Sequence, residues 1–125
     1  MSKRVLIADD ASFMRELLRD VLSEGNYKVV AEAADGDSTV AAFREHHPDI
    51  VTLDIVMPGK SGLEVLRELM ALDPSACVVM CSALGQEALV MEALESGASE
   101  YIIKPFKPDQ VLGALSRATQ KSADE

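Results

Sequence analysis

The sequence has little positive charge and no long apolar run, and each shortage excludes a class of protein. The 12 Lys and Arg residues stand against 21 Asp and Glu, which gives a formal net charge of -9. Such a surface repels phosphate backbones and anionic lipids, so we expect neither nucleic-acid nor membrane binding. No apolar run approaches the roughly 20 residues of a membrane span. The start, MSKRVLIADD, reaches two aspartates too early for a secretory signal, which predicts a cytoplasmic protein.

Cysteine is also scarce. The two cysteines, Cys77 and Cys81, lie in one apolar segment that is typical of a strand, where about 3.3 Å per residue separates their backbones by roughly 13 Å. A disulfide needs at most about 7 Å, and this separation also argues against a shared zinc ion. We expect buried, unreactive thiols in a reducing compartment.

Apolar residues are plentiful and regularly patterned. A chain of 125 residues with 48% hydrophobic content predicts a single domain, 1–125, without repeat or linker. Short apolar runs predict five strands, at residues 5–8, 28–33, 50–53, 76–81 and 100–103. Segments with helical spacing follow each strand, ending before Gly25, Pro48 and Asp73, spanning 85–96, and beginning at Pro108. Asp10 or Ser12 is expected to cap the first helix, and Ser61 with Glu64 the third.

Five strands alternating with five helices predict an α/β, doubly wound fold, in which helices cover both faces of a parallel sheet. Polar side chains follow the ends of these strands: Asp9, Asp10, Asp54, Ser82 and Lys104. Because ligands of such sheets bind beyond the carboxyl ends of the strands, we expect these side chains to converge.

This set of residues suits phosphoryl chemistry. Three converging carboxylates repel one another unless a proton or cation lies among them, and Mg2+ accepts such ligands while keeping positions for phosphate oxygens. Lys104 and Ser82 would hold the other oxygens of a phosphoryl group. Asp54 is central and carboxylates form aspartyl phosphates, so we assign it as the nucleophile.

Four segments together resemble the receiver domain of two-component response regulators, most closely the single-domain chemotaxis response regulators. They are DD at 9–10, LDIVMPGKSG at 53–62, CSA at 81–83 and YIIKPF at 101–106. The match runs from Lys3 to about Thr119, which implies a core over 3–119 followed by a polar C-terminal tail that frays. It also implies the flavodoxin-like strand order 2-1-3-4-5.

The resemblance implies the roles of the acidic residues. Asp54 would accept a phosphoryl group from a sensor histidine kinase. Asp10 would bind Mg2+ directly, Asp9 mainly through water, and Val56 through its backbone carbonyl. A protein of this family assists its own phosphorylation and dephosphorylation but is not an enzyme.

The resemblance also implies how the phosphorylated state is transmitted. Ser82 and Lys104 would contact the phosphoryl group, and the Lys104–Pro105 peptide bond would be cis. As Ser82 moves toward the phosphoryl group, Tyr101 would turn inward. Downstream, a protein target such as a flagellar motor switch component would bind.

The fourth predicted helix offers a surface for such a target. One helix face cannot bury the consecutive residues 89–91, so at least one of them should be exposed. We expect a partner to bind the face formed by Val90, Tyr101 and Ile103. Two residues near the acceptor, Val56 and Leu84, cannot orient a hydrolytic water, which predicts slow loss of phosphate and a separate phosphatase.

Other functions stay open at this stage. The chain could be the receiver fragment of a multidomain regulator such as a chemotaxis methylesterase, which VTLDIVMP resembles. It could be a Mg2+-dependent phosphatase of the haloacid-dehalogenase class, although that class spaces its acid pair by one residue and Asp9 and Asp10 are adjacent. A flavin carrier is disfavoured because no phosphate loop follows the first strand. A scaffold without phosphorylation is disfavoured by the complete set of acids, serine and lysine.

Overall fold

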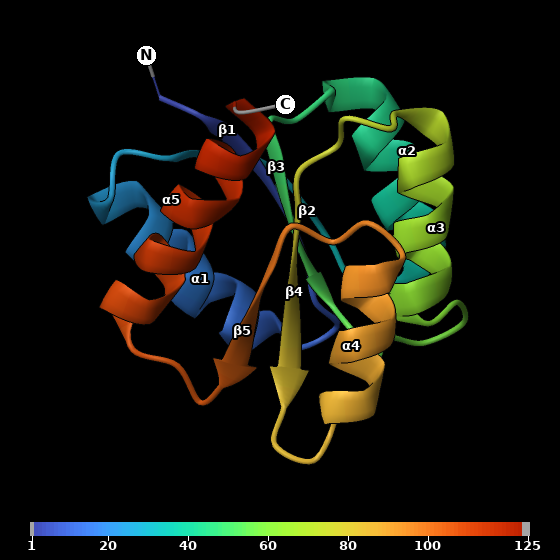
Figure 1. The fold of residues 1–125 in the computed structure, drawn as a ribbon. Helices are drawn as coiled ribbons and strands as arrows, with labels where there is room; N and C mark the ends of the chain where they lie inside the picture. Colours follow the sequence, from blue (N-terminus) through green and yellow to red (C-terminus); the bar gives the residue numbers. More distant parts are fainter. Residues whose placement is uncertain (1, 124–125) are drawn as a thin grey trace.

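Strands and helices alternate along the computed structural model, which describes residues 2–123, with side chains described through residue 120. In this range the strands are β1 (Arg4–Ala8), β2 (Lys28–Ala33), β3 (Ile50–Asp54), β4 (Val78–Ala83) and β5 (Glu100–Lys104) (Figure 1). The helices are α1 (Ser12–Glu24), α2 (Gly36–His46), α3 (Gly62–Leu72), α4 (Glu87–Glu95) and α5 (Pro108–Ala123). None of the described helices is long and apolar enough to cross a bilayer.

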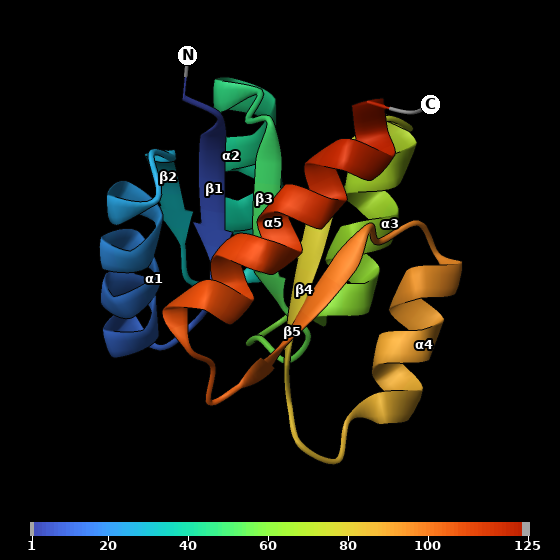
Figure 2. The ribbon, with the colours of Figure 1, turned by 60° about the vertical axis from the view of Figure 1, so that its left-hand side comes forward.

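The strands form one parallel sheet in the order β2-β1-β3-β4-β5, which confirms the predicted fold class and strand order. Helices α1 and α5 cover one face of the sheet, and α2, α3 and α4 cover the other (Figure 2). Because both faces are covered, the central strands are apolar at nearly every position rather than at alternate ones. In β1, for example, Leu6 packs toward α2 and α3 while Ile7 packs toward α1 and α5.

Several elements begin or end at residues that give a local signal. The Glu64 N–H donates to the Ser61 hydroxyl at 3.2 Å, which confirms the predicted cap of α3. Gly97, after α4, has a φ of +113°, a conformation that favours glycine. Both cysteines are buried thiols, as predicted, and neither is part of a disulfide.

Other ends differ from the prediction. The first helix begins after Ala11 without a side-chain cap, so the prediction of Asp10 or Ser12 as its cap was wrong. Strand β4 begins and ends two residues later than predicted, so Ser82 lies inside it. The start of β4 is set where the chain begins to pair with β3. The Val51 N–H donates to the carbonyl of Cys77, the residue just before β4.

Both ends of α4 and the last residue of α5 also differ from the prediction, whereas α5 begins at Pro108 as predicted. Helix α4 spans Glu87–Glu95 rather than 85–96. Helix α5 continues to Ala123, beyond the predicted start of the frayed tail after Thr119. The last two residues of that predicted tail lie outside the described residues.

Candidate functional site

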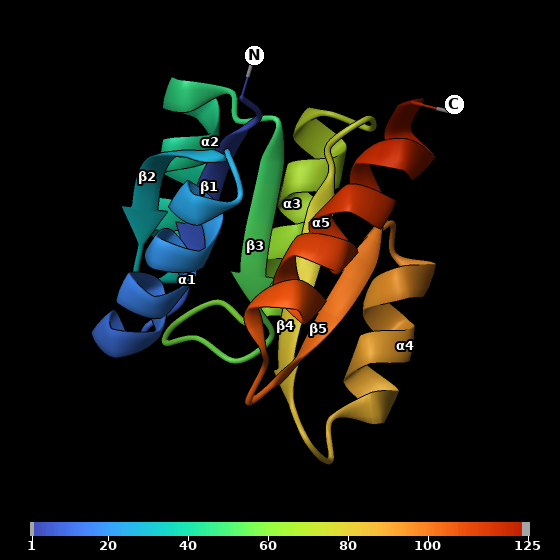
Figure 3. The same cartoon turned by 90° about the vertical axis from the view of Figure 1, so that its left-hand side faces the viewer.

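The carboxyl ends of the strands, with the loops that follow β1, β3, β4 and β5, gather at one end of the sheet (Figure 3). The predicted polar residues all lie on this edge: Asp9 and Asp10 directly after β1, Asp54 at the end of β3, Ser82 in β4 and Lys104 at the end of β5. The register of the parallel strands sets how far along the sheet these residues lie. Asp54 lies opposite Cys81 in β4, and Ser82 lies opposite Ile103 in β5.

Lys104 joins two of the acids. Its ammonium donates to an oxygen of Asp9 at 2.7 Å and to one of Asp54 at 3.1 Å. All three side chains are largely buried, with 19% of Lys104, 2% of Asp9 and 11% of Asp54 exposed. Charges interact strongly where water is excluded, so this contact orients both carboxylates. One cation facing two buried carboxylates still leaves the edge with net negative charge.

This imbalance affects the proton affinities of the site. Burial raises the pKa of Asp54, the charge of Asp9 acts in the same direction, and the contact with Lys104 opposes both. For Lys104, burial favours the neutral amine, but the two carboxylates outweigh it and raise the pKa above the usual lysine value. Lys104 therefore stays charged at neutral pH, and ionised Asp54 lacks sufficient positive charge around it.

The three acids could hold a metal ion. Asp9, Asp10 and Asp54 each offer a carboxylate oxygen, and these oxygens lie within 4.8 Å of one another. Asp10 is exposed, whereas Asp9 is buried and both its oxygens have partners: the Ala11 N–H at 2.9 Å and Lys104. A set of oxygen donors with negative charge fits a hard divalent cation such as Mg2+. A bound cation of this kind would supply the positive charge that the edge lacks.

The loop after β3 is held close to Asp54. The Val56 N–H donates to an Asp54 oxygen at 3.3 Å. The Gly62 N–H, at the start of α3, donates to the Ile55 carbonyl at 2.7 Å. A Cβ on Gly62 would lie 2.2 Å from the Asp54 carbonyl oxygen and 2.6 Å from the Ile55 Cα. Helix α3 therefore begins directly against the backbone at the end of β3.

Two supporting residues were missed from the sequence. In the sequence, Gly62 is only the residue between the Ser61 cap and the apolar residues of the third helix. A glycine at the start of a helix is nevertheless a signal that another part of the backbone packs closely against it. Arg15 donates to the Asp9 carbonyl at 2.7 Å and lies 3.3 Å from Glu32 in β2. An arginine on the polar side of a helix gives no sequence signal for such a contact.

A cavity of about 190 Å³ lies beside the site, between α4 and β5. It is lined by residues that include Ser82, Glu87, Val90, Met91, Tyr101 and Ile103. Tyr101 and Ile103 are partly exposed. The expectation of an exposed residue within 89–91 is confirmed, and that residue is Met91, 58% exposed. Val90 is buried at 7% and forms part of the cavity wall rather than the open surface.

Two further observations concern residues named in the sequence analysis. Val56 and Leu84, the apolar residues in the loops after β3 and β4, are 57% and 74% exposed. The Lys104–Pro105 peptide bond is cis, as the resemblance implies.

Comparison with known proteins places this geometry in a family. The family model of the response regulator receiver domain matches residues 5–116. The chemotaxis protein CheY of Thermotoga maritima is 46% identical over 120 residues, which cover 96% of this chain and 100% of that protein. A protein-glutamate methylesterase/protein-glutamine glutaminase of Haloarcula marismortui is 40% identical over 103 residues, covering 82% of this chain and 28% of that protein.

A solved structure also resembles this chain. It is described as the CheX-CheY-BeF3-Mg+2 complex from Borrelia burgdorferi, and the match has a TM-score of 0.86 at 37% identity. The alignment covers 95% of this chain and 88% of that one.

Proposed function

This chain belongs to the response regulator receiver domain family, and on that premise we propose that it is the phosphoacceptor switch of a chemotaxis pathway, with Asp54 as the acceptor. A sensor histidine kinase donates the phosphoryl group, and the switch domain comprises residues 3–119. The observation that supports this most strongly is the contact of one lysine with two buried carboxylates at the carboxyl edge of the sheet. Lys104 would face an incoming phosphoryl group, and the negative charge that remains at this edge calls for a bound cation as well.

The transfer is a displacement at phosphorus. An Asp54 oxygen forms a bond to phosphorus while the bond from phosphorus to the donor histidine nitrogen breaks, and its electron pair stays on the imidazole. Asp9, Asp10 and Asp54, with the Val56 carbonyl, would hold Mg2+, which supplies charge neutralisation for the phosphoryl oxygens. Lys104 would contribute a second positive charge, and the Ser82 hydroxyl would donate to a phosphoryl oxygen.

The phosphorylated state would be read at the cavity between α4 and β5. Ser82 lies near the carboxyl end of β4 and lines this cavity together with Tyr101, so its movement toward a phosphoryl group would change the cavity beside Tyr101. We propose that a target such as a flagellar motor switch component binds here, over Met91, Tyr101 and Ile103. The CheX-CheY pairing in the Borrelia structure supports a second protein partner for this chain, and we propose that this partner is a separate phosphatase.

Mass spectrometry tests the assignment of Asp54. The protein is incubated with acetyl phosphate, with and without Mg2+, beside Asp54→Asn and the control Asp20→Asn, which alters an exposed carboxylate of α1. We expect a phosphate-sized mass gain that requires Mg2+ and Asp54 and is unchanged in the control. A gain that survives Asp54→Asn would refute the assignment.

Two other functions are distinguished by their own measurements. A receiver fragment of a methylesterase is supported by the Haloarcula relative, but this chain spans only 28% of that protein and all of the Thermotoga protein. The reading frame of the native gene decides between them. A phosphatase would turn over p-nitrophenyl phosphate repeatedly and fast, whereas a switch holds one phosphoryl group per chain at a time and is limited by its slow loss.

A further inference from the structure

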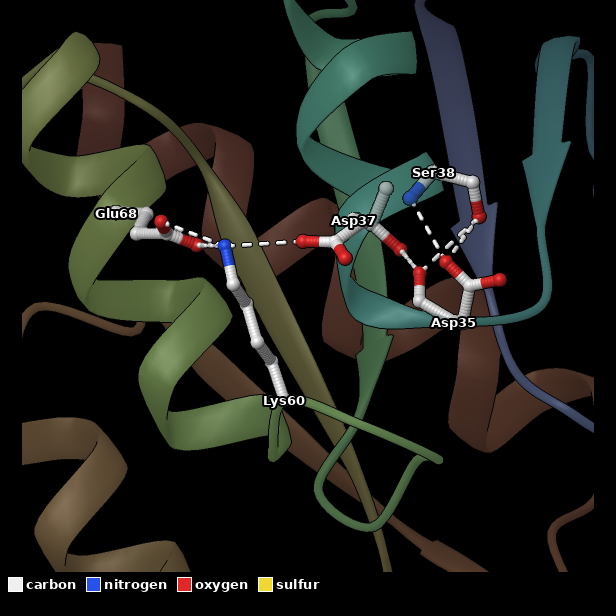
Figure 4. A network of polar contacts seen from close by, with 6 residues as sticks. Asp35, Asp37, Ser38, Lys60 and Glu68 are labelled. Carbon is white, nitrogen blue, oxygen red and sulfur yellow. Dashed lines mark hydrogen bonds and ion pairs between the residues drawn. The ribbon is translucent and has the colours of Figure 1, made fainter.

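An ion network surrounds Lys60 in the loop between β3 and α3 (Figure 4). The Lys60 ammonium lies 3.1 Å from Asp37 in the first turn of α2, and 2.9 Å and 3.0 Å from the two oxygens of Glu68 in α3. These contacts raise the pKa of Lys60. One loop side chain therefore connects two helices on the same face of the sheet.

The backbone near Lys60 is packed as well. Gly36, the first residue of α2, lies so close that an added Cβ would be 2.7 Å from the Lys60 Cβ and 3.3 Å from its carbonyl oxygen. This end of α2 is itself fixed, because the Asp35 carboxylate accepts a hydrogen bond from the Ser38 N–H at 2.8 Å. Lys60 is thus held by backbone packing on α2 and by charge on α2 and α3.

The segment between Asp54 and Lys60 carries groups of the candidate metal site. Val56 donates its N–H to Asp54 and is the residue whose carbonyl would face Mg2+. Met57 is buried, but Val56 is 57% exposed, and Gly59 has a φ of +76° with open space where a side chain would lie. A fixed point at residue 60 limits the conformations that this short segment can adopt.

We propose that Lys60 is a positioning residue: by joining α2 to α3 it fixes the β3–α3 loop and with it the Val56 backbone at the acceptor. Lys60 contacts neither the acceptor nor the metal. The part of this proposal that concerns Mg2+ rests on the proposed function, whereas the ordering of the loop does not.

Electrostatics alone predicts the opposite change in Mg2+ affinity when Lys60 is lost. The chain carries a formal charge of -9, so removing a cation increases its attraction for Mg2+. If Lys60 acted only through its charge, its loss would tighten Mg2+ binding. A positioning role predicts weaker binding, because the Val56 carbonyl must be ordered when the ion binds.

Three variants separate these effects. Lys60→Met keeps the packing stem and removes the charge, and Lys60→Arg keeps a cation that can reach both acids. Arg67→Met is the matched control, since Arg67 forms an exposed ion pair with Glu92, 3.1 Å away, that joins α3 to α4. Hydrogen exchange of the Val56 and Gly62 amides is followed by NMR in metal-free protein. Mg2+ affinity is measured by calorimetry.

We expect Lys60→Met to speed exchange at both amides and to weaken Mg2+ binding, each by about twofold to fivefold, the range for an exposed ion pair. Lys60→Arg should keep the exchange rates and the Mg2+ affinity near their wild-type values, and Arg67→Met should neither speed exchange nor weaken Mg2+ binding. The difference between wild type and Lys60→Met should shrink in 0.5 M NaCl, because salt screens the ion pairs.

Other outcomes overturn the proposal. Unchanged exchange would show that Lys60 does not order the loop, and faster exchange with equal or tighter Mg2+ binding would show that loop order is not used by the metal site. If the wild-type protein binds no Mg2+, the proposed function fails, and the exchange result alone then decides whether Lys60 positions the loop.

Discussion

The Lys104 ammonium lies 2.7 Å from the Asp9 carboxylate although 95 residues separate them in the sequence. Their strands, β5 and β1, are not neighbours, because β3 and β4 lie between them. The lysine therefore extends across the carboxyl ends of two strands to reach its partner. Asp54, at the end of β3, accepts its second hydrogen bond.

Loss of this lysine should destabilise the fold. We expect Lys104→Met to lower the free energy of unfolding by about 3 kcal/mol in metal-free buffer, because it leaves two buried carboxylates without their cation. Mg2+ should stabilise this variant more than the wild type. Urea unfolding with and without Mg2+ measures both effects. The control Lys107→Met, at an exposed lysine, should stay within about 0.5 kcal/mol of wild type, and equal losses in both variants would contradict the prediction.

Asp54→Asn should have the opposite effect on stability. Burial raises the pKa of Asp54, so the fold favours the protonated acid. That stabilisation is complete below the ordinary carboxyl pKa of about 3.9 and is lost as the pH rises through the raised value. At pH 7 without metal, we expect the Asn variant to be more stable by about 1 kcal/mol or more.

Urea unfolding in EDTA between pH 4 and pH 7.5 measures this difference. The stability gain should shrink on acidification. A variant that is equally or less stable than wild type at pH 7 would show that Lys104 fully compensates the buried charge.

Two glycines in the chain after Asp54 should respond differently to substitution by alanine. Gly62→Ala places a Cβ 2.2 Å from a backbone oxygen of Asp54, so we expect a loss of about 3 kcal/mol, at the upper end for overpacking. In Gly59→Ala the added Cβ meets no atom within 4 Å, and only the φ of +76° disfavours alanine. We expect this conformation to lower the stability by about 1–2 kcal/mol. Thermal unfolding compares the two variants. The reverse order of stability would show that α3 can shift away from β3.

The exposed apolar residues beside Asp54, the proposed acceptor, should control the lifetime of the phosphorylated state. The double variant Val56→Asn, Leu84→Glu places polar groups where they can orient water, and we expect phosphate loss to become faster by about tenfold or more. Both positions are more than half exposed, so stability should change little. Decay of the phosphorylated mass with time measures the rate. No acceleration over wild type would count against this explanation of slow hydrolysis.

Much of the fold was predictable because both faces of the sheet are covered. Its strands are continuous apolar runs that stand out from the amphipathic helices, and the polar residues that end them mark the functional edge. Helix α1 was harder to predict. Apolar residues lie on more than one side of this helix, so their spacing does not predict which of them face the sheet. Leu18 and Leu22 are buried, whereas Phe13 is 67% exposed.

The contacts that support the site were not predictable. The approach of Gly62 to Asp54 depends on where α3 sits against β3, and the network of Lys60 depends on the distance between α2 and α3. In the sequence, Lys60 is a lone charge between Gly59 and Ser61, which is typical of a solvated loop residue. Such contacts arise only from the packing of elements that are distant in the chain.

The place of Lys104 in the last strand has a consequence for synthesis of the protein. A ribosome makes Asp9, Asp10 and Asp54 well before Lys104, so a growing chain carries the acids without their cation. The completed site requires β5 to add to the sheet beside β4. A nascent or incompletely folded chain therefore lacks the Lys104 contact with Asp9 and Asp54, and the set of site residues is assembled only when the sheet is complete.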